Sequence, residues 1–162
     1  HKAESVQLKE VHGLKIEKGT WTPVLVGSTV AGNHTYSNQI GRYTKINNLV
    51  YISMRLTITS IDSSASGDLN IAGLPFIAIS QDTGLTISSL ANIKISEEHK
   101  FVFARTIIGT SRIGLVRIGT VTALPSSVPI SSAEANPHAE IRLSGFYETN
   151  WGSELTVDEE VE

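Results

Sequence analysis

The stretch LVYISMRLTITS, residues 49–60, decides the fold class because its apolar side chains recur at every second position. The alternating apolar residues are Val50, Ile52, Met54, Leu56 and Ile58. Successive side chains of a β-strand point to opposite faces of its sheet, so these residues share one face. The other face is more mixed, beginning with Leu49 and Tyr51 and continuing with polar side chains. The stretch therefore predicts a strand with one buried face and one exposed face.

Similar short runs fill most of the chain. The β-branched residues valine, isoleucine and threonine supply 45 of the 162 residues, and these residue types favour strands over helices. The run TWTPVLVG, 20–27, predicts a strand in which Pro23 indicates an edge position. Asn47–Asn48 predicts a tight turn, and AEIRLSGFYET, 139–149, predicts the last strand. About nine strands at roughly ten-residue spacing predict an all-β, antiparallel β-sandwich or jelly roll.

Composition divides the chain into three parts. Residues 1–18 are charged and lack a clear period, which predicts a short N-terminal arm, and residues 19–153 form the predicted β-sandwich domain. Residues 154–162 hold five of the sixteen acidic residues and predict a solvated acidic tail. The rest of the chain has 13 basic and 11 acidic residues, and this near-neutral balance argues against nucleic-acid binding. No apolar run is long enough to cross a membrane.

The sequence carries none of the common catalytic or metal-binding motifs. The absence of cysteine excludes disulfides and cysteine-bound zinc. We predict no metal site, because the histidines have no metal-ligand spacing: His1, His12, His34, His99 and His138. The segment GLVRIGT, 114–120, lacks the lysine of a phosphate-binding loop, and no GxSxG motif occurs. The aromatic residues considered for stacking on carbohydrate are Trp21, Tyr36, Tyr43, Tyr147 and Trp151.

Three stretches together carry a family resemblance. They are residues 19–58, which begin GTWTPVLVG, residues 67–76, GDLNIAGLPF, and residues 141–149, IRLSGFYET. Their order resembles a β-module found at the C-terminal end of bacteriophage tail-spike and tail-fibre proteins. Within that class the chain looks like the releasable C-terminal chaperone domain of the preneck appendage (tail spike) protein of short-tailed Bacillus phages. It departs from many members of the class at Asn47, where they carry glycine.

The resemblance implies an intramolecular chaperone rather than a conventional turnover enzyme. Domains of that family fold as a homotrimer and bring the N-terminal remainder of the same spike polypeptide into register. They then cut themselves off in a single-turnover endopeptidase step and leave in an ATP-dependent step. We therefore expect ATP as the cofactor and a homotrimer in the host cytoplasm during phage assembly. We also expect the segment to be absent from the mature virion.

The same resemblance indicates where this chemistry would lie. The scissile bond would lie at or just before His1, so Glu4 is the nearest carboxylate, and Glu10 is the next. Burial in a trimer can tune such a carboxylate to act as acid, base or nucleophile, with His1 and Lys2 assisting. ATP would bind near a subunit boundary through basic side chains. The candidate basic residues are Arg42, Lys45, Arg112 and Arg117.

Two other functions stay open on the sequence alone. The first is a C-terminal receptor-binding tip of a tail fibre, which stays on the virion and recognises a host-surface glycan or protein. The second is an enzyme acting on cell-wall polymer, although no pair of acids stands out in the sequence. Whether mature virions contain the segment separates the tip from the released chaperone.

Overall fold

The computed structural model describes residues 13–80, 83–119 and 124–150, and within them the chain is all-β. The only helical turn among these residues is the short 3-10 helix η1, Ile130–Ser132. None of the described residues forms a helix long and apolar enough to span a membrane. The strands are β1 (Ile16–Trp21), β2 (Val24–Gly27), β3 (Thr35–Ile46), β4 (Leu49–Ser60), β5 (Leu69–Ala72), β6 (Gly84–Ala91), β7 (His99–Thr106), β8 (Arg112–Gly119), β9 (Ser126–Ser127) and β10 (Ala139–Glu148).

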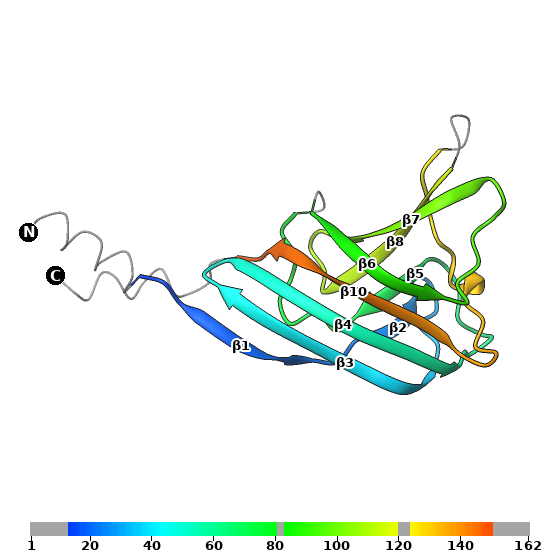
Figure 1. Ribbon diagram of the computed structural model, residues 1–162, viewed down its shortest axis with the longest axis horizontal. Helices are drawn as coiled ribbons and strands as arrows, with labels where there is room; N and C mark the ends of the chain where they lie inside the picture. The colour runs from blue at the N-terminus through cyan, green and yellow to red at the C-terminus, as the bar shows by residue number, and fades with distance from the viewer. Residues whose placement is uncertain (1–12, 81–82, 120–123, 151–162) are drawn as a thin grey trace, which may run out of the picture.

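The strands pair antiparallel in one continuous sheet that curls into a half-barrel. Their order across the sheet is β1-β3-β4-β10-β6-β7-β8-β5-β2, with β9 added to β8. Figure 1 shows the long strands β1, β3, β4, β10 and β6 forming one wall, with β7, β8, β5 and β2 behind it. The all-β, antiparallel prediction is therefore confirmed. The sequence predicts two stacked sheets, whereas the two walls here belong to one sheet that turns between β10, β6 and β7.

The core lies between the two walls and is built on the strand that the sequence marked most clearly. The five alternating residues of β4 are between 0% and 5% exposed, so the predicted register is correct. On β10, Ile141 and Leu143 pair with Leu56 and Met54 and bury the same face. The opposite wall supplies fully or nearly fully buried aliphatic residues: Leu25, Leu69, Ile71, Ile113 and Leu115.

Tyr147 ties the end of β10 to the segment that follows β5. Its side chain is fully buried, and its hydroxyl donates a hydrogen bond to the carbonyl oxygen of Phe76 (3.0 Å). The same hydroxyl accepts a hydrogen bond from the Phe76 N–H (3.2 Å). Burial raises the pKa of Tyr147 well above its usual range, so the phenol keeps its proton and both bonds.

The predicted strand 20–27 is divided into two strands on opposite edges of the sheet. The strand β1 ends at Trp21 and pairs with β3, whereas β2 begins at Val24 and pairs with β5. Proline has no N–H for a sheet ladder, so the chain breaks at Pro23. Because the sheet curls, the two edges come close enough for two residues to connect them.

The predicted turn at Asn47–Asn48 is present and fastens the start of β1. Asn47 has φ 53°, the left-handed conformation that asparagine tolerates. Its N–H donates to the carbonyl oxygen of Lys15 (2.9 Å), and its side-chain oxygen accepts from the Lys15 N–H (3.0 Å). The last three residues of the predicted arm, 16–18, belong to β1, which begins at Ile16. Its first twelve residues lie outside the described part of the chain.

Candidate functional site

The solvent-facing side of β3, β4 and β10 carries polar and aromatic side chains, and we call it the outer face. Antiparallel pairing aligns its side chains in rows across the three strands. One row holds Arg42, Ser53 and Ser144, and the next holds Ile40, Arg55 and Arg142. A third row brings Tyr51 beside Phe146. Residues far apart in the sequence therefore meet on one exposed surface.

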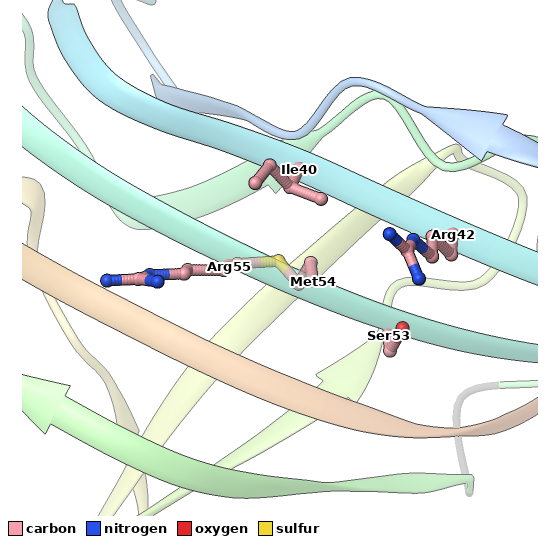
Figure 2. Close-up of a pocket in the computed structure, with 5 residues that line it drawn as sticks. All are labelled: Ile40, Arg42, Ser53, Met54 and Arg55. Atoms are coloured by element: carbon pink, nitrogen blue, oxygen red, sulfur yellow. The ribbon is translucent and has the colours of Figure 1, made fainter.

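A pocket of about 240 Å³ lies open on the outer face between β3 and β4. It is lined by Ile40, Arg42, Ser53, Met54 and Arg55. Figure 2 shows Arg42 and Ser53 facing one another from the two strands, while Arg55 extends in the opposite direction. Among the described residues no carboxylate lies within ion-pair distance of Arg42. The pocket therefore presents a guanidinium group that an anionic ligand can reach.

The electrostatics of the outer face favour anions. Glu140 is the carboxylate beside the pocket, and it pairs with Arg55 (Nε to Oε1, 3.3 Å) and Arg142 (Nη2 to Oε1, 3.0 Å). The hydrogen bond from Arg142 lowers the pKa of Glu140 below its usual value, so this carboxylate stays ionised. The outer face as a whole carries three cations and two carboxylates, which are Arg42, Arg55, Arg142, Glu140 and Glu148. This excess of positive charge contrasts with the net charge of −3 of the whole chain.

The aromatic pair on the outer face was not singled out by the sequence. Tyr51 and Phe146 lie with ring centroids 5.0 Å apart, tilted by 55°, and are 38% and 49% exposed. Four of the predicted stacking residues turn inward instead, because Trp21 and Tyr147 are buried and Tyr36 and Tyr43 are half-buried. The fifth, Trp151, lies outside the described residues. The sequence did indicate that Tyr51 is exposed, because the alternation in residues 49–60 places it on the face of the strand that is not apolar.

The structure does not bring the four predicted nucleotide-binding residues together within one chain. Arg42 is exposed on the outer face, whereas Lys45 is buried with its Nζ 5.3 Å from the centre of the Phe76 ring. Arg112 and Arg117 lie on β8 in the other wall, and the Nε of Arg117 donates to Ser126 (2.9 Å). A site shared between subunits stays a prediction. The predicted cleavage residues His1, Glu4 and Glu10 lie outside the described residues.

A second exposed surface is apolar and lies where β1 begins and β10 ends (Figure 1). Backbone hydrogen bonds join its segments, from Asn47 to Lys15, from Thr149 to Asn48 and from Ile79 to Glu148. Further bonds join Ala78 to Gly109 and Thr110. We call this surface the terminal end, and it consists of Leu14, Ile16, Ile46, Leu49, Ile77, Ile79 and Ile108. These side chains are 37% to 63% exposed, and exposed apolar side chains gathered at one end of a molecule indicate an interaction surface.

No protein-family model matches this chain. It is 35% identical over 77 residues to a depolymerase specific for capsule KN4 from Klebsiella phage K64-1. That match covers 47% of this chain and 10% of the depolymerase. The fold is similar to the crystal structure of the Dettilon tailspike protein (gp208), with a TM-score of 0.64 and 24% identity. This similarity covers 83% of the chain described here and 24% of the tailspike chain.

Both relatives are much longer than this chain, which spans a tenth of one and about a quarter of the other. The tail-spike resemblance expected from the sequence is confirmed at this level. The narrower resemblance, to the preneck appendage of Bacillus phages, stays a prediction. The chain is related to phage tailspike and capsule-depolymerase proteins, and it has the size of one domain of such a protein.

Proposed function

We propose that this chain is an assembly domain of a phage tailspike protein that brings three copies of its polypeptide together. It acts as an intramolecular chaperone for the N-terminal remainder of the same chain, in the host cytoplasm during assembly. It is then cleaved off autocatalytically and released in an ATP-dependent step, so the mature virion lacks it.

The terminal end is the observation that carries this proposal. It gathers seven exposed apolar side chains at the end of the molecule where the chain enters β1 and leaves β10. Burying such side chains against other copies removes apolar surface from water and provides a driving force for association. Contacts at this end would also hold the adjoining segments of three polypeptides close together. A high local concentration of this kind speeds the registration of long β-rich chains, which otherwise register slowly and aggregate.

The cleavage and release steps rest on the resemblance to the preneck appendage domain. We expect Glu4 to act at the scissile bond, with Glu10 and His1 near it. We expect ATP to contact basic residues near a subunit boundary, and Arg42 is the predicted contact that is most accessible within one chain.

Mass spectrometry of the full-length precursor, expressed alone, tests these steps. We expect a 17.5 kDa fragment to be cut from assembled precursor and to dissociate from it after ATP is added. In Glu4→Gln precursor, which keeps the side-chain size and loses its ionisation, we expect assembled but uncut chains. Processing of Glu4→Gln precursor at the normal rate would remove Glu4 from the mechanism. A precursor that is never cut would remove the cleavage and release steps from the proposal.

A second candidate function is a tip domain that stays on the virion and recognises a saccharide of the host surface. The outer face favours it, because this face exposes an aromatic pair beside arginine side chains. The capsule specificity in the name of the Klebsiella phage relative is in keeping with such a role. Peptide mapping of purified virions separates the two candidates. Peptides from 13–150 at full stoichiometry would support the tip, and their absence would support the released chaperone.

A further inference from the structure

We propose that the outer face binds an acidic polysaccharide, with the sugar rings on Tyr51 and Phe146 and the sugar carboxylates on Arg42 and Arg55. This inference deepens the second candidate function and rests on it for the class of ligand. The surface adjoins the terminal end, because Ile46 and Leu49 form the row next to Tyr51 on the same face of β3 and β4. Binding is therefore measured by affinity electrophoresis and assembly separately by sedimentation.

The aromatic pair supplies the apolar part of the recognition. Tyr51 and Phe146 project from neighbouring strands, β4 and β10, at directly paired positions. The centroids of the two exposed rings are 5.0 Å apart, so the rings together form an open platform. The C–H groups on one side of a pyranose ring carry partial positive charge and pack well on the negative face of an aromatic ring. An exposed platform of this kind suits a sugar whose other side stays in water.

The arginines supply the charge. In each strand the second residue after the aromatic row lies roughly 7 Å further along, because a strand rises about 3.3 Å per residue. The next row therefore offers Arg42, Ser53 and Ser144, and the row after it offers Arg55 and Arg142. Planar guanidinium groups pair with carboxylates through two parallel hydrogen bonds. Serine hydroxyls can donate to and accept from sugar hydroxyls.

The shape of the surface favours a polymer over a small anion. The pocket between β3 and β4 is open, and the aromatic row lies next to the row of Arg42 and Ser53 on the same sheet face. A nucleotide would occupy one row of cations and leave the remaining rows unused. A chain of acidic sugars, by contrast, repeats an apolar ring face and a carboxylate along its length, as the outer face repeats its rows.

Affinity electrophoresis of the folded chain tests the proposal with polygalacturonate, alginate and hyaluronate as probes. We expect at least one of these uronate polymers to retard the protein, and its neutral methyl-ester form to retard it at least tenfold less. We expect Arg42→Gln and Phe146→Ala each to weaken binding by about tenfold, the effect of losing one charge-assisted or stacking contact. Thermal unfolding of each variant shows whether the fold is kept.

Matched controls come from β7, on the other wall. Arg105→Gln removes one positive charge and Phe101→Ala removes one aromatic ring, both at positions outside the outer face. We expect both variants to bind the polymers like the unmodified chain. Equal binding of a uronate polymer and its methyl ester would overturn the proposal, as would no retardation by any of the three polymers. Tighter binding of ATP than of the polymers, lost in Arg42→Gln, would overturn it in favour of a nucleotide site.

Discussion

At the scale of single residues, the fold depends on side chains that bury a polar atom together with its partner. Tyr147→Phe would remove a fully buried hydroxyl and leave the N–H and carbonyl oxygen of Phe76 without that partner. We expect the variant to lose about 1–3 kcal/mol of unfolding free energy, measured by urea denaturation. Tyr51→Phe removes an exposed hydroxyl and should change little. Equal stability of Tyr147→Phe and the unmodified chain would contradict the account of this contact.

The register of β4 can be tested at two adjacent residues. Ile52 is fully buried on the inner face and Ser53 lies on the outer face. We expect Ile52→Ala to cost about 2–5 kcal/mol, because it leaves a cavity in a packed core. Ser53→Ala should cost far less. A reversed order of the two effects in denaturation experiments would place β4 one residue out of register.

Glu140 gives the outer face a pH dependence of known sign. Its pKa is lowered in the folded chain by the hydrogen bond from Arg142, with smaller contributions from the charges of Arg142 and Arg55. The ion pair therefore stabilises the fold above the carboxyl's ordinary pKa, and this contribution is lost as the pH falls through the lowered value. We expect Glu140→Gln to be less stable at pH 7, by no more than about 1 kcal/mol because both arginines are partly exposed. The gap should close at low pH, and a gap that widens there would contradict the assignment.

At the scale of strands, β1 is held at an edge of the sheet by β3 alone, and glycine makes that pairing close. Gly41 lies opposite Trp21, and a methyl group added there would come within 2.7 Å of the indole ring and 2.6 Å of the Trp21 carbonyl oxygen. We expect Gly41→Ala to push β1 away and to speed amide hydrogen exchange over Ile16–Trp21. The β10 amides, which pair with β4 and β6, should remain protected. Uniformly faster exchange would show instead that β1 is required for the whole fold.

The sequence predicted correctly those elements whose pattern lies within a short stretch of residues. The period of two in 49–60 and the asparagine turn at 47–48 are local patterns, and both were predicted correctly. The separation of β1 from β2 depends on how far the whole sheet curls, which no local pattern records. The sequence prediction placed Arg42 and Lys45 in one nucleotide site, although their spacing in a strand already argued against it. Residues three apart in a strand point to opposite faces, and Lys45 is indeed buried while Arg42 is exposed.

At the scale of the whole molecule, the two candidate surfaces exist only after folding. The terminal end draws its side chains from four separate stretches of the chain, 14–16, 46–49, 77–79 and 108. The outer face likewise joins β3, β4 and β10, and β4 and β10 are neighbours although about eighty residues separate them in the sequence. Sequence analysis could find the strands and one buried face. It could not show which exposed side chains gather, because that follows from strand order.

Sedimentation equilibrium of the chain at micromolar concentration measures self-association through the terminal end. We expect a particle of three times 17.5 kDa. We also expect that Ile77→Lys combined with Ile108→Lys, two changes of exposed residues at the terminal end, yields a folded monomer. Phe101→Lys is the matched control, because Phe101 is 68% exposed near the other end of β7, and this variant should remain a trimer. A monomeric unmodified chain, or a trimer that persists in the terminal-end variant, would contradict the account.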